Sequence, residues 1–581
     1  MRKGPWEEWL GKPNGLGEQQ PERARQILQG IEFGVAIDYT GDRSISRFGR
    51  NLPVEKEDEP KVEKVIGADC AALKKAGPFD TAPFPVMTIS PIGAVPKKGS
   101  SKIRVIHHLS YPFGGDSINA SVVDEYLPLS TIDDAMDAVR RFGVGALLIK
   151  IDVQAAYKQV PVRREDWPLL GFMWKGKWYY ERVLPFGLKS SCRLWDWYAA
   201  ALHFFLEKHF GIEVVIHYID DFLFVVRPAH SAQAAQHLRD CQSLCLTLGI
   251  PIADEKTEGP TTCLTFLGIE LDTVAMEARL PAAKLADLKL LVNEWHAKRH
   301  ATVRELQSLV GTLSFACKVI RPGRFYLKRI IWHMARMIAH PDVKSHTKDY
   351  WILPEQTRAD IRWWLDFAEE WNGIGLLYER EWSEANKIVV TTDACETGYG
   401  ATCGEDFFFG KWEESHIEAA RRAQKTSMPF LELHALVQAA ATWGHLWAGK
   451  KVLFMTDASV GVAVIKKRTS DSPDTMQLLR LLSTLACRYR FELKAEHIPG
   501  VENIAADALS RYGDCSVFRQ ARPQAQQRAT TPVPLQLLSA QQRAAFSRTG
   551  SQTTPGAPTR PASGGSSASA KKKESAPGGR N

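Results

Sequence analysis

The alternation of hydrophobic and polar positions is most distinctive at 212–226, which reads IEVVIHYIDDFLFVV. Two runs of β-branched and aromatic residues flank Asp220 and Asp221 there. Val, Ile and Phe favour strands whereas Asp does not, so the pattern predicts a hairpin with two carboxylates at its tip. A solvated turn is the alternative for this stretch alone, because Asp is also a common turn residue.

Similar patterns predict further elements on both sides of this hairpin. An apolar strand ends at Asp152, which suits a catalytic carboxylate, although a helix cap is the alternative. Upstream, a hairpin-like segment carries Lys97 on one arm and Arg104 on the other. Cations on both arms suit a polyphosphate, and a solubilising turn is the alternative. Helical periodicity predicts helices at 61–76, at 229–249 and across 281–372.

A second unit of strands and helices begins near residue 386. Two of its predicted strands end at Asp393 and Asp457, Glu432 lies in the first turn of a predicted helix, and a later helix carries Asp507. These acids can converge on one site if the strands are neighbours. Four independent surface acids are the alternative when each residue is taken alone.

Composition adds the location of the charge. The chain has 581 residues, of which 44% are hydrophobic and 24% charged, which suits several globular domains. Residues 513–581 hold ten of the 74 Lys and Arg residues but only two of the 66 acidic ones, so the net charge of +8 lies entirely there. This segment is rich in Gln, Ala, Ser, Pro and Gly, which predicts a disordered basic tail.

Membrane and secretion signals are not apparent in the pattern. No apolar run approaches the roughly 18 residues of a membrane span, and the N-terminal MRKGPWEEWL lacks an apolar signal core. The sequence therefore predicts an intracellular protein, in the cytoplasm or the nucleus, without a membrane partner.

The ordered set of motifs resembles a retroelement reverse transcriptase with a tethered ribonuclease H domain. The palm of such an enzyme is matched by ALLIKIDVQAAY, LPFGLKSS, HYIDDFLF and TFLG, and the fingers by SPIGAVPKKGSSKIRVIHHLS. The ribonuclease H motifs are matched by VVTTDA, LELHAL, LFMTDAS and HIPGVENIAADALSR. The resemblance covers about residues 65 to 512.

Three details favour the DIRS-type retrotransposons, which use a tyrosine recombinase. IHHLSYP and VGTLSFACKVIRPGRF are similar to that group. The motif after Gly187 ends in Ser191 and Cys192, where gypsy-type and retroviral enzymes usually have a proline. A pararetrovirus-like enzyme is left open by these residues.

The resemblance implies an α+β multidomain fold with a right-hand polymerase of fingers, palm and thumb. A helical connection, an α/β ribonuclease H-like domain and a disordered C-terminal tail are expected to follow. The predicted boundaries are 1–60 for an N-terminal extension, 61–275 for fingers and palm, 276–385 for thumb and connection, 386–512 for the ribonuclease H-like domain and 513–581 for the tail.

The resemblance also implies roles for individual residues. Two Mg²⁺ ions per active site, with Mn²⁺ as a substitute, would be bound by seven catalytic carboxylates: Asp152, Asp220, Asp221, Asp393, Glu432, Asp457 and Asp507. The nucleotide-binding residues would be Lys97, Arg104, Tyr157, Phe186, Gly187 and Lys256. The primer grip would be Phe266, Leu267 and Gly268.

The implied activity is RNA-directed DNA synthesis with degradation of the RNA strand of the hybrid. The implied partners are an RNA template, a DNA primer, dNTPs, the RNA–DNA hybrid and other retroelement proteins. A decayed or domesticated copy, acting only as a nucleic-acid-binding protein, is the alternative. The presence of all seven carboxylates favours the enzyme, because decay should strike them as readily as other residues.

Overall fold

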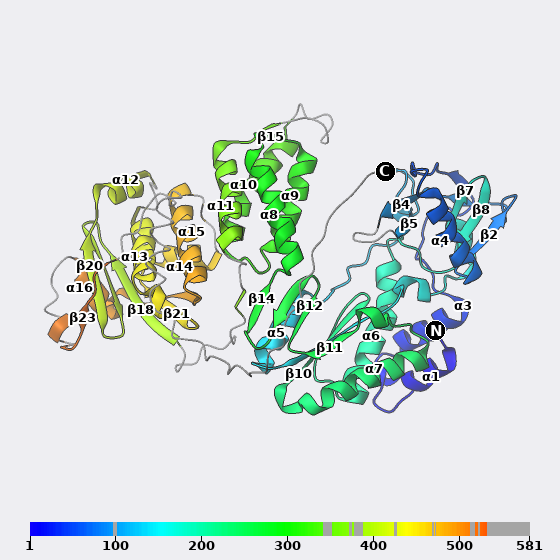
Figure 1. The fold of residues 1–581 in the computed structure, drawn as a ribbon, viewed down its shortest axis with the longest axis horizontal. Coiled ribbons are helices and arrows are strands. Elements are labelled where there is room, and N and C mark those ends of the chain that lie inside the picture. Colours follow the sequence, from blue (N-terminus) through cyan, green and yellow to red (C-terminus); the bar gives the residue numbers. More distant parts are fainter. Residues whose placement is uncertain are drawn as a thin grey trace, which may run out of the picture.

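The computed structural model of the chain shows an α+β fold whose parts follow one another along the long axis of the molecule (Figure 1). A large N-terminal part, blue to green, leads into a bundle of helices, and a yellow and orange α/β unit forms the opposite end. The structure describes residues 1–96, 102–340, 351–370, 375–376, 387–422, 427–467, 470, 472–511, 518–520 and 523–530.

The first 33 residues pack onto the N-terminal part and do not stand apart from it. Trp6 is fully buried, and its ring meets Tyr198 edge-on at 5.7 Å between centroids. Its indole nitrogen donates to the carbonyl of Leu248 at 3.2 Å. No motif was predicted here, because these side chains form a buried face only when they pack against distant parts of the chain. The helices are α1 (Lys3–Leu10), α2 (Leu16–Gln19), α3 (Pro21–Phe33) and α6 (Ser191–Phe210).

A four-stranded central sheet, in the order β11-β6-β10-β9, carries the predicted carboxylate hairpin. Its antiparallel register sets Asp221 directly opposite Asp152. Successive side chains of a strand point to opposite faces. Phe222 and Phe224 therefore join the core beneath α6 and α7, whereas Leu223 joins the core that contains α5. The elements are β6 (Leu147–Asp152), β9 (Val215–Tyr218), β10 (Asp221–Val226), β11 (Glu258–Thr261), α5 (Ile132–Phe142) and α7 (Ala234–Leu248).

A second sheet and a separate hairpin lie at the blue end of the molecule (Figure 1). The sheet has the order β1-β3-β7-β8-β2, and the predicted two-armed hairpin is the pair β4 and β5. The elements are β1 (Arg47–Phe48), β2 (Lys75–Phe79), β3 (Thr88–Ile89), β4 (Ile92–Pro96), β5 (Ile103–His107), β7 (Gly171–Trp174), β8 (Lys177–Glu181) and α4 (Glu59–Ala71).

The region predicted to be helical across 281–372 is, in its described residues, a bundle of α8 to α11 interrupted by two short strands. Thr302 caps α9 by accepting from the backbone N–H of Glu305, whose carboxylate accepts the backbone N–H of Thr302 in return. None of the described helices has both the length and the apolar composition that a bilayer span requires. The elements are α8 (Ala282–Ala297), β15 (His300–Ala301), α9 (Val303–Ala316), α10 (Gly323–Ile338), β16 (Trp351–Ile352) and α11 (Glu355–Glu370).

A small sheet, β12-β13-β14-β17, lies below the bundle. Its strand β17 follows the bundle in the chain and pairs with β14. This pairing returns the chain toward the N-terminal part before the last unit begins. The strands are β12 (Cys263–Phe266), β13 (Ile269–Asp272), β14 (Glu277–Arg279) and β17 (Gly375–Leu376).

The C-terminal unit is a sheet in the order β22-β21-β18-β19-β20-β23 with helices packed on it. The strands are β18 (Lys387–Ala394), β19 (Gly398–Cys403), β20 (Asp406–Lys411), β21 (Lys451–Thr456), β22 (Glu492–His497) and β23 (Gln526–Gln527). The helices are α12 (Glu414–Arg422), α13 (Ser427–Trp443), α14 (Ser459–Lys467), α15 (Pro473–Arg488) and α16 (Ile504–Ser510).

Ordered residues continue beyond the boundary predicted at residue 512. Strand β23 pairs in parallel with β20, and Phe518 is buried against Phe407. Residues 518–520 and 523–530 therefore contribute to the C-terminal unit, which composition alone did not indicate. Residues 531–581, where the rest of the predicted disordered tail falls, lie outside the described residues.

Candidate active sites

The turn between β9 and β10 holds the first group of carboxylates. Ile219 adopts a left-handed conformation with φ 59°, and its carbonyl accepts a hydrogen bond from the indole of Trp195 at 2.7 Å. The carbonyl of Asp220 accepts the backbone N–H of Val153 at 2.8 Å. The turn is thereby tied both to α6 and to the residue that follows β6, which brings Asp220 beside the paired ends of β6 and β10.

The electrostatics of this group show an excess of negative charge. Burial, followed by the charges of Asp220 and Asp152, raises the pKa of Asp221 to about 6. Burial also raises the pKa of Asp220, although the charges of Lys256 and Arg104 act to lower it. Lys256 forms an ion pair with Asp152 at 2.7 Å. A divalent cation with oxygen ligands fits this donor set, because it would favour the charged carboxylates.

Three predicted nucleotide-binding residues lie close together. The rings of Tyr157 and Phe186 are 5.4 Å apart between centroids. Gly187 has φ 107°, and a Cβ there would lie 2.0 Å from the carbonyl oxygen of His107. Only glycine fits such a close backbone approach in that conformation. Lys97, the first predicted fingers cation, lies outside the described residues.

The predicted primer grip is the two-residue turn between β12 and β13. Leu267 and Gly268 both have positive φ, 45° and 77°, as a type I′ turn requires. Phe266 is fully buried, so it anchors the turn without reaching the surface. Lys284 of α8 approaches the turn, since its Nζ lies 2.1 Å from where a Cβ on Gly268 would be, and 4.1 Å from the Phe315 ring centroid. Lys284 was not predicted as part of this site, because helical periodicity does not reveal which element a helix faces.

The second group of carboxylates is more compact. Asp393 on β18, Glu432 on α13 and Asp457 after β21 each offer a ligand atom within 4.8 Å of the others. Among the described residues this is the group that meets that distance, and the trio around Asp152 does not. Because α13 begins at Ser427, Glu432 lies in its second turn and not in the first turn as predicted.

Burial strongly perturbs this second group. Burial, then the charges of Asp393 and Asp457, raises the pKa of Glu432 to about 9. Burial raises the pKa of Asp393 to about 6 although the Ser510 hydroxyl donates to its carboxylate. The side-chain amide of Asn503 also donates to it at 3.4 Å. Two buried carboxylates with raised pKa values, within reach of the third carboxylate of Asp457, fit a divalent cation. Ser510 and Asn503 were not predicted as site residues, although their position beside Asp507 in one short motif was an available signal.

Asp507, the fourth predicted acid of this group, lies at its margin. Its side chain is 42% exposed and forms an ion pair with Arg511 at 2.8 Å. Its charge still contributes to the raised pKa of Asp393. The structure thus brings three of the four predicted acids together and leaves Asp507 close to them.

Comparison with known proteins bears on the first group. Residues 95–271 match the family model described as reverse transcriptase (RNA-dependent DNA polymerase). The chain contains a reverse transcriptase domain. This domain spans the central sheet, the hairpin turn and the first group of carboxylates.

The relatives that this chain matches include viral and transposon polyproteins. Polyprotein P3 of Commelina yellow mottle virus is 23% identical over 436 residues, which cover 73% of this chain and 20% of the relative. The transposon Tf2-3 polyprotein of Schizosaccharomyces pombe is 22% identical over 511 residues, covering 86% and 34%. The chain thus spans about a fifth to a third of the length of these curated relatives. The DIRS-type assignment stays a prediction.

Solved structures of foamy viral protease–reverse transcriptase align over most of the chain. The dRH form in complex with double-stranded DNA has a TM-score of 0.48 and 15% identity, and the alignment covers 86% of this chain and 82% of that one. The form in complex with an RNA/DNA hybrid has a TM-score of 0.45 and 14% identity, with 85% and 62% covered.

Proposed function

We propose that this chain is an RNA-directed DNA polymerase that copies a retroelement RNA into DNA, and that its C-terminal unit is a ribonuclease H that degrades the RNA strand of the hybrid. The observation that carries the proposal is the register of β6 and β10, which sets Asp152 opposite Asp221 within the reverse transcriptase domain. The substrates would be an RNA template, a DNA primer and dNTPs.

In the polymerase reaction, Asp152, Asp220 and Asp221 would hold two Mg²⁺ ions. Such ions lower the pKa of the primer 3′-hydroxyl and neutralise the leaving pyrophosphate. Arg104, whose charge already acts at Asp220, would bind the triphosphate. Lys256 would exchange its partner Asp152 for a phosphate oxygen, since a bound cation would occupy that carboxylate.

Sugar selection would fall to the aromatic pair beside this site. The ring of Tyr157, packed against Phe186, would occupy the space of a ribose 2′-hydroxyl and reject ribonucleotides by steric clash. Gly187 would let the backbone approach the incoming base or ribose closely. The turn of Leu267 and Gly268 would support the primer strand.

In the nuclease reaction, Asp393, Glu432 and Asp457 would hold two Mg²⁺ ions, with Asp507 at the margin. Such ions activate a water molecule for attack on the phosphodiester. Ser510 would keep the Asp393 carboxylate oriented through its hydroxyl hydrogen bond. Recognition of the 2′-hydroxyl would confine cleavage to the RNA strand.

The test is primer extension on an RNA template and cleavage of a labelled hybrid, measured on one preparation with Mg²⁺. We expect Asp220→Asn to abolish extension and to retain cleavage, and Asp457→Asn to do the reverse. Each variant therefore controls for the folding of the other. The proposal fails if the wild type shows no Mg²⁺-dependent extension, or if Asp220→Asn extends undiminished. RNA binding without either reaction would instead fit a domesticated copy.

A further inference from the structure

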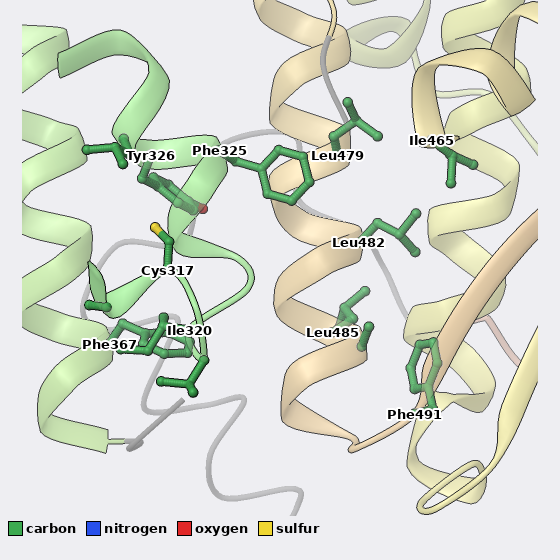
Figure 2. Close-up of a cluster of buried hydrophobic side chains, with 14 of the residues drawn as sticks. Cys317, Ile320, Phe325, Tyr326, Phe367, Ile465, Leu479, Leu482, Leu485 and Phe491 are labelled. Carbon is green, nitrogen blue, oxygen red and sulfur yellow. The ribbon is translucent and has the colours of Figure 1, made fainter. Parts of the chain in front are cut away.

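The helical bundle and the C-terminal unit share one hydrophobic core where α10 lies beside α15. Figure 2 shows Phe325 between these two helices, with Tyr326 on the bundle side. On the other side of α15, Leu482 and Leu485 face Phe491. Phe325 is 6% exposed and Tyr326 is fully buried. The two units are therefore packed against each other at this contact.

Arg480 of α15 crosses the contact and forms polar links to the bundle. Its guanidinium donates to the carbonyl of Phe325 at 3.1 Å and to the carboxylate of Asp360 on α11 at 3.2 Å. It also lies over the ring of Tyr326 at 4.7 Å. The side chains of Arg480 and Asp360 are only 6% and 3% exposed. Arg329 of α10 forms a second ion pair with Asp360 at 3.3 Å.

Another ion pair links the C-terminal unit to the small sheet that contains β14. Arg490, which follows α15, pairs with Glu277 of β14, whose side chain is 10% exposed. Arg480 lies inside α15 and Arg490 lies beyond its end at Arg488, so more than two turns of helix, roughly 12 Å, separate the two attachment points. Two separated attachment points oppose both rotation of the C-terminal unit and its dissociation from the rest of the molecule.

The energetics indicate what the buried pair contributes. Desolvation of both charges offsets most of their attraction, so apolar side chains would hold the units together equally well. A guanidinium presents its donors in a fixed planar fork, and its hydrogen bonds are therefore directional. The network around Asp360 thus selects one orientation of the two units.

We infer that Arg480 is a positioning residue that, through Asp360, fixes the C-terminal unit relative to the reverse transcriptase domain and so sets the distance on the hybrid between nucleotide addition and RNA cleavage. This inference rests on the proposed function. The partners of Arg480 lie on α10 and α11, outside both carboxylate groups. Its loss should alter where the RNA is cut without altering the chemistry of either site.

The experiment maps RNA cuts relative to the recessed 3′ end of a DNA primer, with the full chain, Mg²⁺ and end-labelled RNA. We expect the wild type to cut mainly at one distance from the primer end. Arg480→Met should spread the cuts over many distances, so that the main position becomes a minority of the product. Primer extension and cleavage of a hybrid without a primer end should be unchanged. Arg488→Met, at an exposed position of the same helix, is the matched control and should cut like the wild type.

A second variant separates orientation from folding. Loss of Arg480 alone leaves Asp360 buried with a weaker set of partners, which can unfold the contact. The double variant Arg480→Met/Asp360→Leu removes both charges and should restore thermal stability while the cuts stay spread. A single sharp cut position in either folded variant would overturn the inference. Absence of both extension and cleavage in the wild type would instead overturn the proposed function.

Discussion

Glu432 shows at the scale of one residue how the second group of carboxylates departs from ordinary carboxyl chemistry. Its side chain is buried beside Asp393 and Asp457, and its pKa is raised from 4.5 to about 9. The folded protein without a cation therefore binds a proton at Glu432 that the unfolded chain has already released. Binding of the proposed cation would be linked to folding at this position, because a cation favours the charged carboxylate.

Stability without metal should consequently depend on pH through Glu432. Its contribution is fully present below about 4.5 and is lost as the pH rises toward about 9. We expect Glu432→Gln to flatten this fall in the free energy of unfolding, measured by urea titration in EDTA across that window. Added Mg²⁺ should stabilise the wild type at the alkaline end and not the variant. Glu502→Gln, at an exposed position, should follow the wild type. An equally steep fall in Glu432→Gln would contradict the prediction.

Gly187 offers a second prediction for a single residue. Alanine there would combine φ 107° with a Cβ 2.0 Å from a backbone oxygen, and such strain costs on the order of 1–3 kcal/mol. We expect Gly187→Ala to impair primer extension while hybrid cleavage persists. Gly67→Ala, with no atom within 4 Å of the new Cβ, should leave both activities intact. Normal dNTP incorporation by Gly187→Ala would refute the steric argument.

At the scale of elements, local patterns predicted most of the strands and helices that carry the carboxylates. The strand ending at Asp152 is confirmed as β6, and the hairpin around Asp220 is confirmed as β9 and β10. Local patterns do not predict which elements pack against each other. Trp6 and Leu248 are joined by a hydrogen bond although they are 242 positions apart in the sequence, and hydrophobic periodicity does not indicate such a distant partner.

The packing of α1 onto α6 and α7 should be an integral part of the N-terminal fold. Because Trp6 is fully buried, Trp6→Ala should lower the free energy of unfolding by about 3–5 kcal/mol. Denaturant unfolding followed by circular dichroism measures this change. Trp332→Ala removes a tryptophan that is 60% exposed, and should cost within about 0.5 kcal/mol. Equal stabilities of the two variants would show that the N-terminal helices are dispensable.

At the scale of the whole molecule, the two carboxylate groups lie on separate units joined through the bundle (Figure 1). Both units were predicted from the order of the motifs, because each motif lies at the end of a strand or in a helix that the local sequence pattern indicates. The relative placement of the units was not predictable, because it depends on buried contacts such as that of Arg480 with Asp360.

Residues 1–512 contain equal numbers of acidic and basic residues, so the net positive charge of the chain lies in the C-terminal segment.

That charge gives a prediction for RNA binding. Residues 531–581 contain seven Lys and Arg residues and one Glu. Deleting them should reduce the slope of log affinity for single-stranded RNA against log salt by up to about 5, if each cation neutralises one phosphate. Fluorescence anisotropy over a salt series measures the slope. A full-length variant with these cations replaced by Gln should behave like the deletion, and an unchanged slope in both would exclude the electrostatic role.

The pairing of β6 with β10 restricts which changes in chain length the first group of carboxylates tolerates. A single residue inserted into or removed from either strand would exchange the inward and outward sides of everything beyond it. The carboxylate of Asp221 would then enter the hydrophobic interior, and Phe222 would take its place at the edge. Insertions or deletions of an even number of residues keep each side chain on its original face of the sheet. Related sequences should therefore differ in the length of these strands by even numbers of residues.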